Sequence, residues 1–217
     1  LGMSGGVDSS TAAAYLLQEG YEVVGVTFLF KDDEASKDAA HDAAEVCAMM
    51  GIRHVTWPCT DEFEKSVIKP FLASYASGMT PSPCVVCNAS CKVPQLIAAA
   101  DELGCAFVAT GHYARVARLE ENGRFVVKAA LDHAKDQSYM LSQLTQDQLS
   151  RLILPLGGTT KASVRIAAAE LGLPVAAKKD SQDICFIEGD LDAYLQEHGV
   201  EGAPGDIVDS IGKAVGC

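Results

Sequence analysis

The sequence predicts an α/β protein with a doubly wound, mainly parallel sheet. Two observations support this fold class. Buried, β-rich segments alternate with helical segments, and the chain opens on a glycine- and serine-rich turn that leads directly into a helix. Ligands of such sheets bind at the carboxyl ends of the strands. We therefore expect the opening turn, the segment after Phe28 and residues 110–112 to lie together.

Turn residues and apolar periodicity place the elements of the first half. Helical patterns end at Gly20, Gly51 and Gly104, and glycine is the residue that most readily ends a helix. Pro70 is expected to kink the third helix. We expect helices over 8–19, 36–50, 60–77 and 92–103, strands over 21–30, 53–57 and 105–109, and a loop rich in proline and cysteine over 80–91.

The second half is expected to begin with a surface hairpin near 115–129, because a polar turn around Asn122 and Gly123 separates two short apolar runs. Helices are expected over 160–171 and 190–198. Residues 205–216 resemble the start of a β-rich segment.

Composition places this chain of 217 residues among globular proteins, since 48% of the residues are hydrophobic and 21% are charged. No apolar run has the length of a membrane span, so we expect no membrane association. The net charge of −12 argues against a surface that is basic throughout. Residues 84–187 hold almost equal numbers of acidic and basic side chains, so a local basic surface fits there.

The opening turn, Gly2-Met-Ser-Gly-Gly-Val-Asp-Ser-Ser10, has the residue types of a phosphate site. Its glycines allow close approach and positive φ, and the following helix adds unpaired N–H donors and a favourable dipole. The turn lacks the lysine of a Walker loop. It resembles the pyrophosphate loop of ATP pyrophosphatases, which cleave ATP between the α- and β-phosphates. The alternative is an ordinary capped glycine turn.

The cysteines form the second candidate site. The chain has eight, at positions 47, 59, 84, 87, 91, 105, 185 and 217. Without a secretory signal we expect reduced thiols in the cytoplasm. Cys84 and Cys87 form a Cys-x-x-Cys pair, which with Cys185 suits thiol catalysis, an iron–sulfur cluster, or a zinc site completed by Cys91. Unrelated buried thiols are the remaining alternative.

Other polar residues supplement these sites. Lysines lower thiol pKa values, and the candidates for this are Lys92, Lys178 and Lys179. The segment Thr110-Gly-His-Tyr-Ala-Arg115 follows a predicted strand and suits a nucleotide or phosphate. The segment Lys135-Asp-Gln-Ser-Tyr139 suits polar recognition of RNA. Thr160-Lys161, with Arg165 one turn later, forms either a capped surface helix or a phosphate contact that positions RNA.

Together these segments resemble the tRNA-specific 2-thiouridylases of the ATP pyrophosphatase superfamily. The motifs that carry the resemblance occur in the same order along nearly the whole chain. They are the opening turn, Pro81-Ser-Pro-Cys-Val-Val-Cys-Asn88, Ala109-Thr-Gly-His-Tyr113, Lys135-Asp-Gln-Ser-Tyr139, Leu156-Gly with Thr160-Lys161, and Lys179-Asp-Ser-Gln-Asp-Ile-Cys-Phe186.

The resemblance implies roles for individual residues. The ATP phosphates are held by Gly2, Met3, Ser4, Gly5, Gly6, Val7, Asp8 and Ser9, while Phe28 and Gly111 lie in the nucleotide pocket. Mg²⁺ accompanies ATP near Asp8, Ser9 or Ser10. Cys87 is the nucleophile and Cys185 carries a persulfide. The tRNA is contacted by Ser82, Pro83, Cys84, His112, Lys135, Asp136 and Gln137.

The chain departs from the family at Cys84, where many members have aspartate. Cys84, Cys87 and Cys185 thereby form a trio that resembles the ligands of a [4Fe–4S] cluster in other tRNA-thiolating enzymes. The second departure is length. The resemblance implies a catalytic domain over 1–187, the beginning of a central linking domain over 188–217, and a C-terminal β-barrel that is not in this chain.

The implied activity is ATP-dependent 2-thiolation of the wobble uridine of tRNA. Uridine O2 is adenylylated, and sulfur then comes from a cysteine persulfide, with a Cys87–Cys185 disulfide as product, or from cluster-bound sulfide. The partners are tRNA and a sulfur-donor protein or inorganic sulfide. The rival interpretations are an amide-forming synthetase with the same opening turn and a non-catalytic metal- or RNA-binding module.

Overall fold

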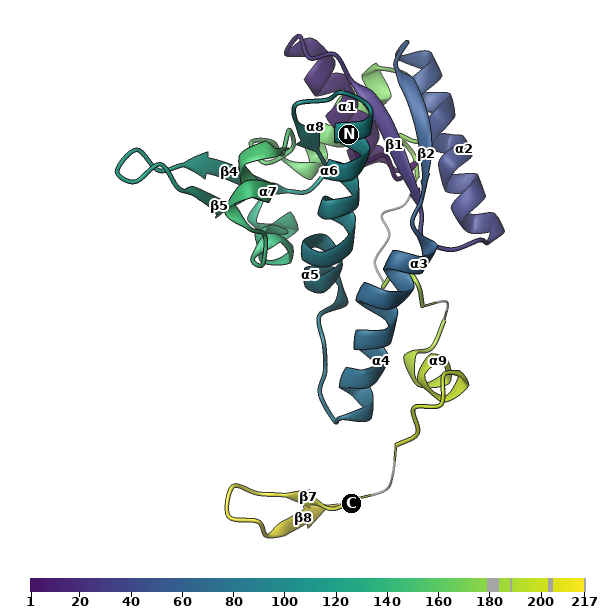
Figure 1. Cartoon of the computed structure of the whole chain (residues 1–217), viewed down its shortest axis with the longest axis vertical. Coiled ribbons are helices and arrows are strands. Elements are labelled where there is room, and N and C mark those ends of the chain that lie inside the picture. Colours follow the sequence, from purple (N-terminus) through teal and green to yellow (C-terminus); the bar gives the residue numbers. More distant parts are fainter. Residues whose placement is uncertain (179–183, 188, 203–204, 217) are drawn as a thin grey trace.

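The computed structural model describes residues 1–178, 184–187, 189–202 and 205–216 (Figure 1). Its α-helices are α1 (Val7–Gln18), α2 (Glu34–Met49), α3 (Thr60–Phe63), α4 (Lys69–Ala76), α5 (Pro83–Cys87), α6 (Val93–Glu102), α7 (Gln146–Arg151), α8 (Lys161–Glu170) and α9 (Leu191–Glu197). Its strands are β1 (Val24–Leu29), β2 (Arg53–Pro58), β3 (Val108–Ala109), β4 (Ala114–Arg118), β5 (Phe125–Ala129), β6 (Leu152–Ile153), β7 (Ile207–Val208) and β8 (Ala214–Gly216). Two π-turns, η1 (Glu64–Ile68) and η2 (Asn88–Lys92), and two 3₁₀ turns, η3 (His133–Lys135) and η4 (Ser138–Leu141), complete the described elements.

The central sheet is parallel, and the first three residues of the chain lie in its middle. The Met3 N–H donates to the Val26 carbonyl of β1 at 2.8 Å, and the Gly2 N–H donates to the Ala109 carbonyl of β3 at 2.9 Å. Strand β2 pairs with β1, and β6 pairs with β3, both in parallel. The spatial order is therefore β2, β1, residues 1–3, β3, β6. This confirms the predicted doubly wound parallel fold and places its switch point between residues 1–3 and β3.

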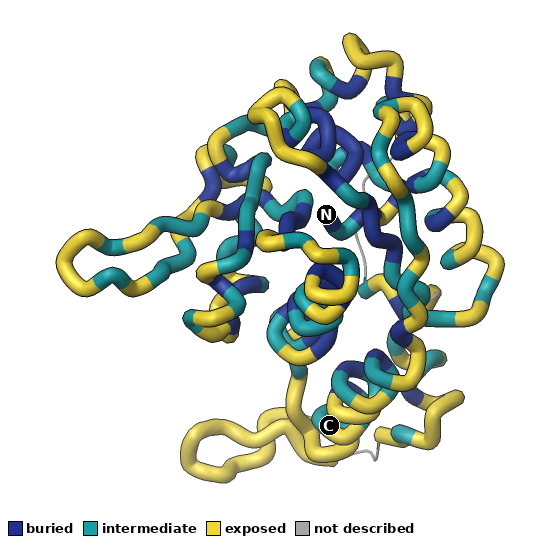
Figure 2. Tube along the Cα trace, turned by 45° about the horizontal axis from the view of Figure 1, so that its top comes forward, coloured by how far each residue is buried: buried dark blue, intermediate teal, exposed yellow. Residues whose placement is uncertain are grey.

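Apolar clusters cover both faces of this sheet. On one face, α1, α2 and α8 pack over Met3 and Ala109. On the other, α6 packs over Val26 and Val108 together with residues of η4 and α7. Alternate residues of a strand point to opposite faces, which is why neighbouring sheet residues fall into different clusters. Figure 2 shows the buried part of the trace concentrated on α1, the sheet and α6.

A third apolar cluster lies beyond the sheet, between two composite helices. One runs through α3, η1 and α4, and the other through α5, η2 and α6. Each contains a π-turn immediately before a helix with proline in its first turn, at Pro70 and Pro94. Proline cannot donate the usual helical hydrogen bond, and the wider turn absorbs this defect. The Lys69 N–H accordingly bonds five residues back, to the Glu64 carbonyl.

The structure corrects the expectation of a loop over 80–91. Residues 83–92 are helical, with Pro83 in the first turn, where its missing N–H costs nothing, and with the π-turn η2 leading into α6. The cysteines of this segment therefore lie on a helix. The strand expected over 105–109 is also shorter than predicted and is limited to β3.

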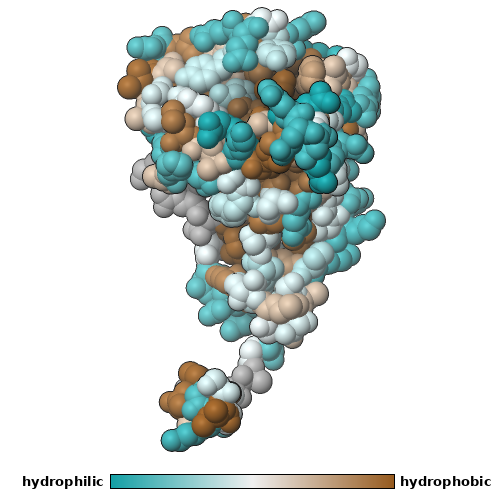
Figure 3. Space-filling view, turned by 90° about the vertical axis from the view of Figure 1, so that its left-hand side faces the viewer, coloured by the Kyte–Doolittle hydropathy of each residue, from teal (hydrophilic) through white to brown (hydrophobic). Residues whose placement is uncertain are grey.

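Two hairpins project from the body. Strands β4 and β5 pair in antiparallel register, and β7 and β8 form a second hairpin near the C-terminus (Figure 1). The second hairpin exposes apolar side chains and stands apart from the body in Figure 3. Its exposed large apolar residues are Ile207, Val208, Ile211 and Val215.

Candidate functional site

The opening turn lies at the carboxyl end of residues 1–3, at the switch point of the sheet. Gly5 has φ +65°, and a Cβ there would approach the Ala39 carbonyl to 2.6 Å, so glycine is required. The Ser9 hydroxyl accepts from the Ser4 N–H at 3.1 Å and donates to the Gly6 carbonyl at 3.1 Å, which holds the turn closed. The first amides of α1 precede its hydrogen-bonded turns, and such amides bind anions.

Gly111 joins β3 to this turn. A Cβ at Gly111 would lie 2.9 Å from the Ser9 nitrogen and 3.0 Å from the Asp8 carbonyl carbon. The backbone after β3 therefore touches the first turn of α1 directly. Two of the three carboxyl-end segments that the sequence predicts to converge, the opening turn and residues 110–112, are confirmed to lie together.

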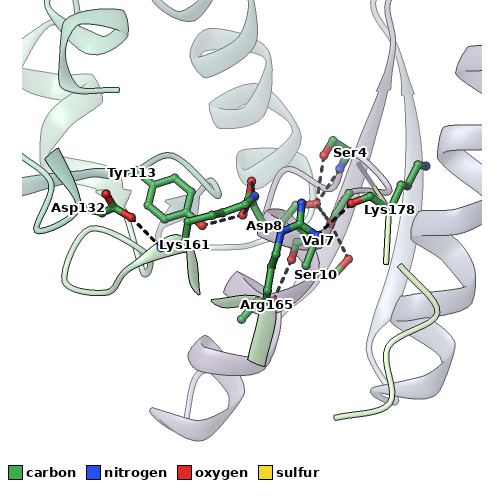
Figure 4. A network of polar contacts seen from close by, with 12 residues as sticks. Ser4, Val7, Asp8, Ser10, Tyr113, Asp132, Lys161, Arg165 and Lys178 are labelled. Carbon is green, nitrogen blue, oxygen red and sulfur yellow. Dashed lines mark hydrogen bonds and ion pairs between the residues drawn. The ribbon is translucent and has the colours of Figure 1, made fainter. Parts of the chain in front are cut away.

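Asp8 is the centre of a polar network (Figure 4). Lys161, at the start of α8, places its Nζ 2.7 and 2.8 Å from the two carboxylate oxygens of Asp8. The Tyr113 hydroxyl donates to the same carboxylate at 2.7 Å. The Lys161 N–H donates to the Asp132 carboxylate at 2.9 Å. Sequence reasoning placed Thr160-Lys161 and Tyr113 in separate motifs, and their contact with Asp8 had no sequence signal.

Lys178 lies at the opening turn and not beside the thiols. Its Nζ donates to the Gly5 carbonyl at 3.0 Å and to the Asp42 carboxylate at 2.6 Å. Arg165 of α8 donates to the carbonyls of Ala176 and Lys178, both at 3.2 Å, and so fixes this segment. The expectation that Lys178 activates a thiol is therefore wrong. Lys179 lies outside the described residues.

Cys84 and Cys87 lie one turn apart on α5, with Cys87 buried and Cys84 half-buried. A hydrogen bond from Cys91 lowers the pKa of Cys87 to about 7, and the charge of Lys92 adds to this effect. Burial raises the pKa of Cys84, against the opposing charge of Lys92. Of Lys92 and Lys178, the two described lysines among those named from the sequence, Lys92 is thus the one that acts on the thiols.

Cys185 lies close enough to Lys92, Cys87 and Cys84 for their charges to change its pKa. The residue is exposed at one side, yet the protein around its thiol raises its pKa. The charge of Lys92 opposes that rise, and Cys87 and Cys84 add to it. The structure thereby brings the distant Cys185 to the Cys84–Cys87 helix.

A further pair of thiols lies beneath Cys87. The Sγ atoms of Cys59 and Cys91 are 3.6 Å apart, and both side chains are buried. Their contact raises the pKa of Cys91, which therefore holds its proton and donates it as a hydrogen bond. Because a loop was expected over 80–91, the helical spacing of Cys87 and Cys91 was not predicted. Cys59 belongs to the other composite helix, far from both in the sequence.

Among the described residues, no group of three or more His, Cys, Asp or Glu side chains is arranged to hold a metal ion. The described residues include Cys84, Cys87, Cys91 and Cys185, the ligands proposed for an iron–sulfur cluster or zinc. The described thiols are thus not gathered as a metal site in this structure, the [4Fe–4S] cluster stays a prediction, and we derive no step through one.

His112 connects the two halves of the site. Burial lowers the pKa of its imidazole to about 3, with a smaller effect from the charge of Lys92. Its Nδ1 lies 2.8 Å from the Thr110 hydroxyl. His112 is hence neutral. It follows Gly111, which touches the opening turn, and it is affected by the charge of Lys92, which also acts on Cys87.

The expected tRNA segment turns out to be partly structural. Asp136 accepts from the Ala130 N–H and the Ser138 hydroxyl, both at 2.6 Å. The Gln137 side chain accepts from the Tyr113 N–H at 3.0 Å. Lys135 is exposed. The following turn η4 packs against α5, so this segment is adjacent to the helix of Cys87.

The remaining predicted residues lie around the same region. Ser82 and Pro83 begin α5, directly before Cys84. Phe28 lies at the carboxyl end of β1, is partly buried, and stacks at 5.4 Å against Phe30. Phe28 packs against both the cluster below α6 and the cluster that contains Cys87.

A family model described as the tRNA methyl transferase HUP domain matches residues 1–189. Curated relatives named tRNA-specific 2-thiouridylase MnmA include one from Moorella thermoacetica, 46% identical, and one from Chloroflexus aurantiacus, 47% identical. Both alignments cover 99% of this chain, and they cover 63% and 62% of the respective relatives. The chain thus spans less than two thirds of their length. These matches confirm the resemblance seen in the sequence.

Among solved structures, the U34-tRNA thiolase NcsA from Methanococcus maripaludis, determined with its [4Fe-4S] cluster, is similar with a TM-score of 0.54. The match covers 91% of this chain and 62% of that one at 19% sequence identity. At this identity the likeness shows the fold alone.

Proposed function

The chain belongs to the family of the tRNA methyl transferase HUP domain, and on that premise we propose that it carries the centre of a tRNA-uridine 2-sulfurtransferase. In this reaction O2 of the wobble uridine of tRNA is replaced by sulfur at the cost of one ATP. The names of the curated relatives support this activity.

One observation carries the proposal. A phosphate-type turn and an activated thiol lie within reach of the same groups: Gly111 lies against Ser9, His112 follows Gly111 in the chain, and the charge of Lys92 lowers the pKa of both His112 and Cys87. An amide-forming synthetase needs the turn but not the thiols. A binding module needs neither a thiol of lowered pKa nor a glycine turn at a switch point.

The opening turn is proposed to bind the phosphates of ATP. The amides of Val7, Asp8 and Ser9 belong to the first turn of α1, where the helix dipole favours negative charge. Uridine O2 attacks the α-phosphorus, and the bond to the bridging oxygen of the β-phosphate breaks, releasing pyrophosphate. The uridine oxygen then leaves as part of AMP. Like other base chemistry, this step requires the uridine to leave the stack.

Sulfur transfer is proposed to use Cys185 and Cys87. The terminal sulfur of a persulfide on Cys185 attacks C2 of the activated uridine and displaces AMP. The Cys87 thiolate then attacks the Cys185 Sγ, which breaks the S–S bond to the base and leaves 2-thiouridine and a Cys87–Cys185 disulfide. The lowered pKa of Cys87 makes the thiolate available near neutral pH.

Mg²⁺ is proposed to arrive with ATP, coordinated by the phosphates and by water, and would neutralise their charge. Ser9 and Ser10 hydroxyls lie at the turn, each donating to the Gly6 carbonyl. The Asp8 carboxylate is bound to Lys161 and Tyr113, so it fits a direct metal ligand less well.

The partners proposed are tRNA, in the cytoplasm, and a sulfur-donor protein or inorganic sulfide. The half-buried Cys84 lies on α5, which η4 packs against, and the exposed Lys135 lies three residues before η4. We propose that a flipped uridine and its flanking phosphates dock in this region. In the part of the chain that the structure describes, every helix is too short or too polar to cross a membrane.

The test measures pyrophosphate release from ATP and 2-thiouridine formation on unmodified tRNA. We expect both for the wild-type protein, and pyrophosphate release without 2-thiouridine for Cys87→Ser and Cys185→Ser. Full 2-thiouridine formation by Cys185→Ser would remove Cys185 from sulfur transfer, and ATP cleavage without 2-thiouridine in the wild type would favour the amide-forming synthetase. Failure of the wild type to cleave ATP in the presence of tRNA would favour the binding module.

A further inference from the structure

Cys59 and Cys91 are a pair of buried thiols in contact, and the sulfur transfer described above uses neither. Their Sγ atoms are 3.6 Å apart. Cys91 is fully buried at 0% exposure, and Cys59 is 4% exposed. They come from different composite helices, since Cys59 precedes α3 and Cys91 lies in η2.

Cys87 connects this pair to the reaction. Cys91 follows Cys87 by four residues on one continuous helix, and residues at this spacing are neighbours on a helix surface. The interaction with Cys91 is the largest cause that lowers the pKa of Cys87. All three cysteines belong to the same apolar cluster, together with Phe63 and Phe186. The series of neighbouring thiols therefore runs from Cys185 through Cys87 and Cys91 to Cys59.

We propose that Cys59 and Cys91 form a second redox dithiol, which takes over the disulfide of Cys87 and Cys185 by exchange inside the protein. The inference rests on the proposed function for the origin of the first disulfide. The exchange itself requires only that Cys87 be oxidised, whether by Cys185 or by a small disulfide reagent.

The exchange balances without an external oxidant or reductant. The hydrogen bond from Cys91 lowers the pKa of Cys59, so the ionised form of Cys59 is the base that takes the proton of Cys91. The Cys91 thiolate attacks the Cys87 Sγ, the Cys87–Cys185 bond breaks, and Cys185 leaves and takes up one proton. Cys59, having given up its proton, attacks the Cys91 Sγ and displaces Cys87 as a thiolate. One disulfide is consumed, one is formed, and the proton first held by Cys91 ends on Cys185.

Distance, leaving-group pKa and burial support transfer of the disulfide from Cys87 to Cys59 and Cys91. A disulfide needs an S–S distance near 2.05 Å, so the two sulfur atoms must close by about 1.5 Å from their present contact. Thiols of low pKa leave faster in such exchanges, and Cys87, whose pKa is lowered to about 7, is the leaving thiol of the second step. Burial makes Cys59 and Cys91 hard to reach for external thiols, so Cys87 is their route of access.

The consequence is a thiolation centre that recovers on its own after one turnover. Once the disulfide has moved inwards, Cys87 and Cys185 are both reduced and ready for a new persulfide. The Cys59–Cys91 disulfide persists until exchange through Cys87 reduces it, with oxidation of a cellular dithiol.

The test is disulfide mapping of the fully reduced protein after treatment with Ellman's reagent, a bulky disulfide. Peptides are analysed by mass spectrometry under non-reducing conditions. We expect a Cys59–Cys91 disulfide in the wild type and at least a tenfold loss of it in Cys87→Ser. Cys105→Ser, which changes a half-buried thiol outside this cluster, is the matched control and should behave as the wild type.

Three outcomes would overturn the proposal. The first is that Cys59 and Cys91 remain thiols while Cys87 is oxidised. The second is that Cys59 and Cys91 oxidise equally fast in Cys87→Ser. The third is that Cys87 does not react with the reagent. The mapping of the wild type needs no variant, so misfolding of a mutant cannot obscure it. Because neither ATP nor tRNA is present, its outcome is independent of the thiolation assay that tests the proposed function.

Discussion

The Nζ atom of Lys161 lies 2.7 and 2.8 Å from the two carboxylate oxygens of Asp8, although the residues are 153 positions apart in the chain. The lysine side chain is 10% exposed and the aspartate side chain 34% exposed. The contact joins the start of α8 to the first turn of α1, directly beside the opening turn. It holds the helix whose amides are proposed to bind phosphate.

Replacing Lys161 by methionine should therefore weaken both the fold and ATP binding. Loss of a charged hydrogen-bond partner from a partly buried carboxylate costs about 1–3 kcal/mol, and the exposure of Asp8 favours the lower end. Urea unfolding and the KM for ATP report the two effects. The control is Lys37→Met, which removes exposed ion pairs to Asp32 and Glu34 and should leave the urea midpoint almost unchanged. Equal effects of the two variants would contradict the role given to Lys161.

Gly111→Ala should displace the first turn of α1. The added Cβ would lie 2.9 Å from the Ser9 nitrogen, and the obstacle is backbone, so the cost is about 1–3 kcal/mol. We expect the KM for ATP to rise at least about tenfold, which corresponds to 1.4 kcal/mol. Gly158→Ala is the matched control, because a Cβ there meets no atom within 4 Å. An unchanged KM in Gly111→Ala would show that this contact does not shape the nucleotide site.

Alkylation of Cys87 by iodoacetamide should depend on pH with a midpoint near 7. Its pKa is lowered to about 7 chiefly by the hydrogen bond from Cys91, so the rate rises as the pH rises through 7 and then levels off. In Cys91→Val the midpoint should move upwards towards the ordinary cysteine value, and the rate at pH 7 should fall by about tenfold. Quantitative mass spectrometry of the Cys87 peptide measures this. Cys105→Ala should retain the wild-type profile, and a Cys91→Val profile identical to wild type would exclude the hydrogen bond as the cause.

Lys135 and Asp136 are neighbours with different expected roles. Lys135→Met should lower tRNA affinity for all sequences and reduce the salt dependence of binding by about one phosphate contact, with stability unchanged. Binding titrations at several salt concentrations measure this. A salt slope equal to that of the wild type would remove Lys135 from the tRNA surface.

Asp136→Asn should instead act on stability and its pH dependence. Hydrogen bonds from Ser138 and the Ala130 N–H lower the pKa of Asp136 below its ordinary 3.8. The folded-state pKa is lower than the unfolded one, so this stabilisation is complete above the ordinary value and is lost as the pH falls through the folded pKa. The variant should therefore lose stability at pH 7 and converge with the wild type in acid. Thermal unfolding between pH 2 and pH 7 tests this, and a constant difference across that range would refute it.

Removal of iron should leave thiolation intact. The described cysteines form no group of three or more metal-binding side chains, although Cys84, Cys87 and Cys185 interact electrostatically. Protein purified anaerobically should contain substoichiometric iron and sulfide and should keep its activity after treatment with a chelator. Stoichiometric [4Fe–4S] whose removal abolishes thiolation would replace the persulfide route by the cluster route.

The order of strands and helices could be predicted because each element carries its own local signal. Apolar periodicity and terminating glycines give the elements within a few residues, as at α1 and β2. The helical nature of residues 83–92 could not be predicted in this way. Prolines and cysteines suggest a loop locally, whereas the π-turn before Pro94 that makes the helix continuous is stabilised by packing against η1.

By itself the sequence determined the alternation of strands and helices, the glycine turn with the chemistry of a phosphate site, and the set of thiols available for sulfur chemistry, since these follow from local residue types. The tertiary structure alone decided which of these residues meet. It placed Lys161 on Asp8, Lys178 on the Gly5 carbonyl and Lys92 beside Cys87, and it brought Cys59 to Cys91. Contacts between residues far apart in the chain depend on how the helices pack on the two faces of the sheet. Local residue patterns do not determine that packing.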